Sequence, residues 1–220
     1  MFFMPTLCAL SSCGIALHLL SLTSGNADGL GAARHAELML VGAAVGAERV
    51  TVLNRTDFAD GFAEEWNLSA ASDAVVQYVK EAGVYFDKVL TFDEFGASHH
   101  PNHVDTHLAV RHAAHRLRKL AGTFLNLRTR TWAQVCMERA QAIMLSLAVH
   151  LCWRKTPSKA RIRAAALLSR HSCCASWRAM GCHATQWKWF RKLHVLFSQY
   201  TYVNIIDVVW DTRFAHEASL

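Results

Sequence analysis

Apolar runs of strand length alternate with longer segments of helical period through the first half of the chain. The predicted strands, each followed by a polar or glycine-containing loop, are residues 15–22, 48–53 and 87–92. The predicted helices are residues 1–13, 32–44, 70–81 and 103–120. This alternation predicts an α/β fold, with a Rossmann-like, mostly parallel sheet and helices on both faces. Ligands in such folds gather at the carboxyl ends of the strands, where these loops lie.

The pattern is less regular beyond Gly122. Residues 123–129 suit a further strand, and residues 131–179 mix apolar and basic positions without a clear period, which we interpret as helix-rich. A helical period returns over residues 183–200. The apolar face of this predicted helix carries Trp187, Phe190, Leu193, His194 and Phe197.

Composition adds a size limit and a charge. Of the 220 residues, 52% are hydrophobic, which suits one compact domain over residues 1–220. The formal net charge of +6 predicts attraction to nucleic acid, acidic lipid headgroups or phosphorylated substrates, and charge alone does not choose among them. The seven cysteines include no C-x-x-C pair, which argues against a disulfide framework or a zinc ribbon and favours a reduced, cytosol-facing protein.

No apolar stretch reaches the roughly 18 to 20 residues that a transmembrane helix needs. The best run, residues 143–153, contains His150 and stops at Arg154, so we interpret it as a buried element. Residues 1–22 are also apolar, but they contain no Lys or Arg and are interrupted by Pro5. We therefore do not interpret them as a secretory signal peptide.

The densest candidate chemistry is the string Ser98-His99-His100-Pro101-Asn102-His103, at a strand–loop–helix junction. Imidazole is the commonest metal ligand near neutral pH, and His100 and His103 could take different roles, one on a metal and one facing a substrate. His103 and His107 form a rival pair, because residues four apart share a helix face. The alternative is a solvated histidine-rich loop, in a chain with thirteen histidines.

Two other loops carry candidate binding groups. The glycine-containing loop 24–31 could hold a phosphate at the start of the helix bearing Arg34, although it matches neither a Walker loop nor G-x-G-x-x-G. The alternative is a glycine turn followed by an Arg34/Glu37 pair on an exposed helix. Asp57 and Asp60 could bind sugar hydroxyls or form only an acidic turn.

Aromatic and basic side chains alternate over residues 187–192. This pattern suits RNA stacking or an anionic membrane surface. An amphipathic core helix with a basic flank would produce the same pattern, and the three interpretations stay open.

Several strings, taken in order along nearly the whole chain, resemble the N-acetylglucosaminyl-phosphatidylinositol de-N-acetylases, a family related to the bacterial deacetylases of the mycothiol and bacillithiol pathways. In the first half they are Met1-Phe2-Phe3 with Pro5-Thr6-Leu7, Ser24-Gly25-Asn26 with Gly29, Arg34-x-x-Glu37-Leu38, Asp57-Phe58 with Asp60, Thr91-Phe92-Asp93-x-x-Gly96-x-Ser98, and His100-x-Asn102-His103. In the second half they are His183-x-x-Gln186, Trp189-Phe190-Arg191-x-Leu193, Phe197-Ser198-x-Tyr200 and Asn204. Their shared order and spacing carry the resemblance.

The resemblance implies hydrolysis of the N-acetyl group of N-acetylglucosaminyl-phosphatidylinositol, the second step of GPI-anchor synthesis. Zn²⁺ would be held by a His and an Asp of a His-Pro-Asp-Asp-Glu motif together with His103, and the motif's other Asp would be the general base. His100 would stabilise the oxyanion or protonate the departing amine. Asn26, Arg34 and Asp57 would contact the substrate. The metal would lower the pKa of a bound water and polarise the acetamide carbonyl.

The chain departs from the family pattern in four places, two of which are Asp105 and residues 131–179, which follow the family poorly. Met1 aligns just after the His-Pro-Asp-Asp-Glu motif, so the family's first strand is expected to be missing and the chain as given to be inactive, with further sequence upstream. His99 replaces a usual glycine. The resemblance further implies a phosphatidylinositol glycolipid substrate, a place on the cytoplasmic face of the endoplasmic reticulum membrane, peripheral contact with that membrane, and no nucleic-acid partner.

Two alternatives come from other functional classes. The chain could be a non-catalytic relative that binds a glycolipid or a partner, because it lacks two zinc ligands and the general base. It could instead be a basic RNA-binding module, on the evidence of charge and residues 187–192 alone, and its binding would then fall steeply with salt.

Overall fold

The computed structural model describes residues 1–130, 167–168 and 172–211. Most of the predicted helix-rich segment 131–179 and all of the apolar run 143–153 lie outside these residues. Contacts divide the chain into two compact units, a first unit of residues 1–53 and 130–205 and a second unit of residues 54–129 and 206–220. The prediction of a single domain over residues 1–220 stays a prediction.

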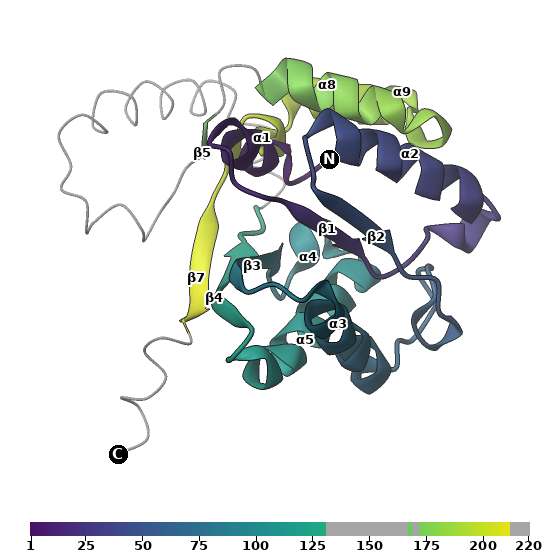
Figure 1. The fold of residues 1–220 in the computed structure, drawn as a ribbon. Helices are drawn as coiled ribbons and strands as arrows, with labels where there is room; N and C mark the ends of the chain where they lie inside the picture. Colours follow the sequence, from purple (N-terminus) through teal and green to yellow (C-terminus); the bar gives the residue numbers. More distant parts are fainter. Residues whose placement is uncertain (131–166, 169–171, 212–220) are drawn as a thin grey trace, which may run out of the picture. The chain divides into compact units, whose positions relative to one another are not determined.

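The first unit begins with helix α1 and a two-stranded parallel sheet. Its elements up to residue 53 are α1 (Met4–Ser12), β1 (His18–Ser21), the 3-10 turn η1 (Asn26–Asp28), α2 (Gly31–Ala44) and β2 (Arg49–Val52). Strands β1 and β2 run side by side, with His18 opposite Arg49 and Ser21 opposite Val52 (Figure 1). Helix α2 packs closely on β2, since a Cβ on Gly42 would lie 2.2 Å from a methyl of Val50.

The second half of the first unit is mainly helical, with one short pair of strands. Its elements are β5 (Leu167–Leu168), α8 (Ser172–Cys182), η4 (Ala184–Gln186), α9 (Trp189–Phe197), η5 (Gln199–Thr201) and β6 (Val203–Asn204), and β5 pairs antiparallel with β6. Helices α1, α2 and α8 share a core of four buried side chains, Met4, Val41, Val45 and Ala179. Burial of such apolar side chains is the main force that holds helices together.

The second unit carries a three-stranded mixed sheet. Its elements are η2 (Thr56–Phe58), α3 (Leu68–Ala82), β3 (Phe86–Phe92), α4 (Gly96–His99), α5 (Pro101–Leu117), β4 (Ala121–Leu127) and β7 (Ile206–Asp211), in the strand order β3-β4-β7. Strands β3 and β4 are parallel, and β7 is antiparallel to β4. Helix α3 starts where the Asn67 side chain accepts the Ala70 N–H at 3.0 Å, and it ends at Gly83, whose φ is +66°.

The predicted fold class is confirmed, and so are the strands and helices up to residue 129, with small shifts of their ends. The prediction of one helix over residues 183–200 is wrong, because that segment consists of η4, α9 and η5. Strand β7 was not predicted. It becomes a strand by pairing with β4, some eighty residues earlier in the chain, and local periodicity cannot reveal such a contact. None of the helices in the described part of the chain is long and apolar enough to cross a bilayer.

Candidate functional site

The predicted histidine string lies on a strained loop between β3 and α5 in the second unit. The backbone φ is positive at Gly96 (+65°), Ala97 (+59°) and His99 (+56°). Residues with a Cβ rarely adopt this region, and such strain persists only where the surroundings enforce it. The loop therefore needs contacts that hold it in place.

Asp93 and Thr129 supply those contacts. The Asp93 carboxylate accepts hydrogen bonds from the Thr129 backbone N–H and hydroxyl, and it also accepts from the Phe95 N–H at 3.2 Å. The Thr129 hydroxyl oxygen in turn accepts the Ala97 N–H at 2.8 Å. We call the three hydrogen bonds that Thr129 makes with Asp93 and Ala97 the Asp93–Thr129 clamp. It ties the positive-φ segment to the ends of β3 and β4.

His103 lies in the first turn of α5 and is largely buried. Its Nδ1 is 2.8 Å from the Gly96 carbonyl oxygen, and its ring stacks on Phe92 with centroids 4.2 Å apart. A carbonyl oxygen only accepts, so Nδ1 carries the proton and the lone pair is on Nε2. Burial, with a smaller contribution from nearby His100, lowers the His103 pKa to about 4, and the ring is therefore neutral at pH 7.

His100 has the opposite proton arrangement. It is the N-cap of α5, and its Nδ1 accepts the Asn102 backbone N–H at 3.3 Å, so the proton of the neutral ring lies on Nε2. Its ring lies 4.3 Å from the Phe62 ring and 5.1 Å from the His103 ring, between centroids. The two histidines are therefore neighbours, one set up to donate from Nε2 and the other to accept at Nε2.

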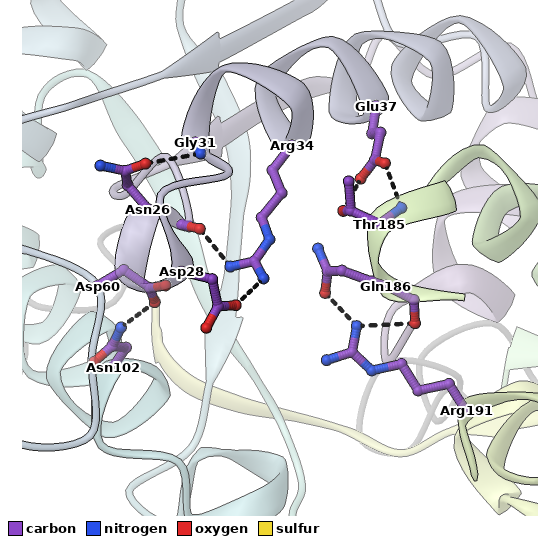
Figure 2. A network of polar contacts seen from close by, with 11 residues as sticks. Asn26, Asp28, Gly31, Arg34, Glu37, Asp60, Asn102, Thr185, Gln186 and Arg191 are labelled. Atoms are coloured by element: carbon purple, nitrogen blue, oxygen red, sulfur yellow. Dashed lines mark hydrogen bonds and ion pairs between the residues drawn. The ribbon is translucent and has the colours of Figure 1, made fainter. Parts of the chain in front are cut away.

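Asp60, a candidate for binding sugar hydroxyls, and Asn102, for which the sequence predicts no role, both join this site. The Asn102 amide donates to an Asp60 carboxylate oxygen at 2.7 Å (Figure 2). The Asn102 Oδ1 atom is buried and has no hydrogen-bond partner among the described residues. Both carboxylates lie in the predicted acidic loop, and the structure brings Asp60 rather than Asp57 to Asn102 at the start of α5.

Asp57 lies elsewhere on the same loop. Its half-exposed carboxylate is 2.5 Å from an Arg55 guanidinium nitrogen, and its backbone carbonyl accepts the Asn67 N–H at 2.9 Å. Asp57 thus contacts Arg55 and Asn67, and its predicted role as a substrate contact stays a prediction.

Asn26 and Arg34 belong to the first unit, where they organise the glycine loop. The Asn26 side chain accepts the Gly31 N–H at 2.8 Å at the start of α2. Arg34 points from α2 toward this loop and donates to the Gly25 carbonyl and to Asp28 (Figure 2). Gly25 has a φ of +70°, which favours glycine at this turn.

Glu37 is not part of an exposed Arg34/Glu37 pair, so that interpretation is wrong. Its carboxylate is buried and accepts the backbone N–H and the hydroxyl of Thr185 at 2.7 and 2.8 Å (Figure 2). His183 Nδ1 lies 3.6 Å from the same carboxylate. Burial alone would raise the Glu37 pKa, but these hydrogen bonds and His183 together lower it.

The fit to a metal ion is partial. Metal-binding histidines usually donate their other ring nitrogen to a carbonyl or carboxylate, and His103 does so to Gly96. The described residues nevertheless contain no group of three His, Cys, Asp or Glu side chains that could hold an ion. His107, the rival partner of His103, is buried with Nδ1 2.9 Å from the Phe92 carbonyl oxygen, so it supports the structure. Of the two, His103 is therefore the better candidate for a metal ligand, and the described residues do not complete its site.

Comparisons with known proteins identify relatives of this chain. An N-acetylglucosaminyl-phosphatidylinositol de-N-acetylase of Bos taurus is 32% identical over 211 residues, which cover 94% of this chain and 78% of the relative. A probable enzyme of the same name in Dictyostelium discoideum is 32% identical over 106 residues, which cover 47% of this chain and 40% of the relative.

A solved structure of N,N'-diacetylchitobiose deacetylase from Pyrococcus horikoshii has a similar fold. The TM-score is 0.53 over 98% of this chain and 80% of that protein, with 12% sequence identity. Residues 1–114 match the family described as PIG-L: GlcNAc-PI de-N-acetylase. The chain therefore belongs to the PIG-L family of GlcNAc-PI de-N-acetylases.

Proposed function

We propose that this protein acts in GPI-anchor synthesis, where it hydrolyses the N-acetyl group of N-acetylglucosaminyl-phosphatidylinositol to acetate and glucosaminyl-phosphatidylinositol. The observation that carries the proposal is the pair of neighbouring imidazoles at the start of α5. Their rings are 5.1 Å apart and use opposite nitrogens for their own hydrogen bonds. The relatives that share the family are named for this deacetylation.

His103 would bind the metal ion, taken as Zn²⁺ from the resemblance, through Nε2, and the ion would supply Lewis acidity and a water of lowered pKa. His100 would donate from Nε2–H to the acetamide oxygen as negative charge develops there. The same group would afterwards be placed to protonate the departing amine. Asp60 would hold Asn102, and through it the first turn of α5, in position.

Substrate binding is assigned to Asn26, Arg34 and Asp57. The Arg34 guanidinium supplies positive charge at the glycine loop, which suits the anionic phosphoinositol part of the substrate. The proposed place of action is the cytoplasmic face of the endoplasmic reticulum membrane, where the glycolipid would be reached peripherally.

A non-catalytic, glycolipid-binding role is the second candidate. It is favoured by one observation, the lack of a three-residue metal group among the described residues. The string His-Pro-Asp-Asp-Glu does not occur in these 220 residues. Catalytic zinc normally needs three protein ligands, so the zinc content per chain and the release of acetate distinguish the two candidates.

The deciding experiment compares the chain with a version extended at its N-terminus by a strand that ends in the His-Pro-Asp-Asp-Glu motif implied by the family resemblance. The extended protein should bind one zinc ion and release acetate from the glycolipid. His100→Gln should keep the zinc and lower the rate by about 10²–10⁴-fold, whereas His103→Ala should lose the zinc. An extended protein that folds and binds zinc but releases no acetate would contradict the deacetylase and favour the binding role.

A further inference from the structure

Helix α9 of the first unit presents large apolar side chains to solvent. Trp189 is 73% exposed, Phe190 52%, Leu193 45% and Phe197 50%. These four residues, which we call the α9 face, follow the i, i+1, i+4, i+8 spacing of one helical stripe. Val195 lies on the opposite side and is fully buried, and α9 contacts α8 (both helices are labelled in Figure 1).

The apolar face predicted for residues 183–200 is only partly exposed, because Trp187 and His194 are partly buried whereas Phe190, Leu193 and Phe197 are exposed. A core helix would bury the α9 face, but here Val195 packs inward and the four side chains of the face stay 45–73% exposed. A contiguous patch of three aromatic rings and a leucine is unusual on a free surface and is typical of an interaction site.

The charge around the patch is positive. Lys188 and Lys192 flank it, and the Lys192 ammonium group lies 5.7 Å from the centre of the Trp187 ring. The Arg191 guanidinium lies 5.8 Å from the centre of the Phe190 ring. The described residues 172–206 contain four Lys or Arg and no Asp or Glu. No carboxylate of this segment would repel an anionic surface.

We propose that the α9 face docks on an anionic lipid bilayer. The rings and Leu193 would enter the boundary between headgroups and acyl chains, while Lys188 and Lys192 meet lipid phosphates. Trp189 suits this depth because its ring is apolar while its indole N–H can hydrogen-bond at the wet boundary, and the purely apolar Phe190 and Phe197 rings can lie beside the acyl chains. The inference rests on the proposed function in one respect, since a lipid-linked substrate would be reached from such a surface.

Other occupants fit less well. A second copy would bring two equally basic stretches together, and like charges repel. Single-stranded RNA would use the rings for stacking, but Leu193 lies between Trp189 and Phe197 on the stripe and offers no ring. An acyl-chain environment suits all four side chains.

The test is vesicle flotation of the purified chain, without any N-acetylglucosaminyl lipid. Vesicles of phosphatidylcholine with about 30% phosphatidylinositol should carry the protein, and pure phosphatidylcholine vesicles should carry much less. Leu193→Asn and Trp189→Asn should each reduce the floated fraction several-fold. Lys188→Gln with Lys192→Gln should reduce it on the anionic vesicles and weaken its dependence on salt.

Val84→Asn is the matched control, because Val84 is 47% exposed and lies in the second unit. It should float like the unchanged chain, and circular dichroism should show that every variant is folded. Equal flotation of the Leu193→Asn and Val84→Asn variants would overturn the proposal. The proposal would also be overturned if a dimer or an RNA complex formed through the α9 face while no protein floated with the vesicles.

Failure here is distinguishable from failure of the proposed function. If the extended protein deacetylates detergent-dispersed substrate but the chain does not float, the docking surface is wrong and the enzyme assignment stands. If the chain floats but the extended protein releases no acetate, the surface stands and the deacetylase assignment fails.

Discussion

At the scale of single residues, the direction of each imidazole determines what the site can do. His100 and His103 have the same side chain, yet one accepts a backbone N–H at Nδ1 and the other donates from Nδ1 to a carbonyl. The sequence shows that both are present but not which nitrogen each has available, because the partner of each ring is set by the backbone of the strained loop. Two further residues, His99 and His194, are expected to affect the stability of the fold.

His99→Gly should stabilise the fold. His99 has a φ of +56°, a conformation that costs an L-residue about 1–2 kcal/mol and glycine almost nothing, although glycine loses more chain entropy on folding. We expect a net gain of about 0.5–1 kcal/mol in the free energy of unfolding, measured with urea. His112→Gly, at an exposed position within α5, is the control and should cost about 1 kcal/mol. If His99→Gly lowered the free energy of unfolding as much as His112→Gly does, the backbone at His99 would not be strained.

Acid should destabilise the protein through His194. Burial, together with nearby positive charge including Arg191, lowers the His194 pKa to about 4, and its Nε2 is buried without a hydrogen-bond partner in the described structure. The unfolded state therefore binds more protons than the folded state between pH 6.5 and 4. Stability is complete above about pH 6.5 and falls as the pH drops toward 4, by about 1–3 kcal/mol from this residue.

Unfolding by urea at a series of pH values measures this slope, and the His194→Phe variant provides the comparison. Phenylalanine keeps a ring at the same place without a titrating group, so the slope should become shallower. His103, whose pKa is also lowered to about 4, acts in the same direction and leaves part of the slope in the variant. An unchanged slope would mean that His194 does not carry this effect.

At the scale of elements, the molecule depends on contacts between segments that local pattern does not reveal. The end of β3 and the end of β4 hold the histidine loop through the Asp93–Thr129 clamp. Helix α2 sits on β2 only because position 42 has no side chain. Both contacts can be tested by small changes.

Thr129→Val should loosen the histidine loop. Valine keeps the shape of threonine but removes the hydroxyl that donates to Asp93 and accepts from Ala97, so two hydrogen bonds are lost in a partly buried place. We expect a loss of about 1–3 kcal/mol and faster hydrogen exchange of the Ala97 amide. Thr129→Ser keeps the hydroxyl and should retain the protection of that amide. Similar exchange in both variants would show that the clamp does not order the loop.

Gly42→Ala should destabilise the protein, although alanine is the better helix former. The added Cβ would lie 2.2 Å from a Val50 methyl, so α2 must move away from β2, at a cost of about 1–3 kcal/mol. Gly181→Ala in α8 is the matched control, because nothing lies within 4 Å of the added atom. There the same change should stabilise by up to about 1 kcal/mol, as seen in thermal unfolding. If Gly42→Ala and Gly181→Ala changed the stability in the same direction, the close packing of α2 on β2 would be contradicted.

At the scale of the whole molecule, two compact units divide the predicted site residues. The first unit holds Asn26 and Arg34, and the second holds Asp57, His100 and His103. Family membership rests on the match over residues 1–114 and on a relative that is similar over 94% of the chain. The α9 face lies outside residues 1–114, in a part of the chain where the sequence pattern allowed three interpretations.

The sequence by itself determined the alternation of strands and helices up to residue 129 and the position of the histidine string at a strand–helix junction. These features are local, because periodicity and turn residues act over a few neighbours. Tertiary structure decided the rest: the antiparallel β7, the bond from Glu37 to Thr185 across 148 positions, the orientation of each imidazole and the exposure of the α9 face. These features depend on which distant segments come into contact. A helical stripe of apolar residues has the same sequence pattern whether it is buried against another element or exposed to solvent.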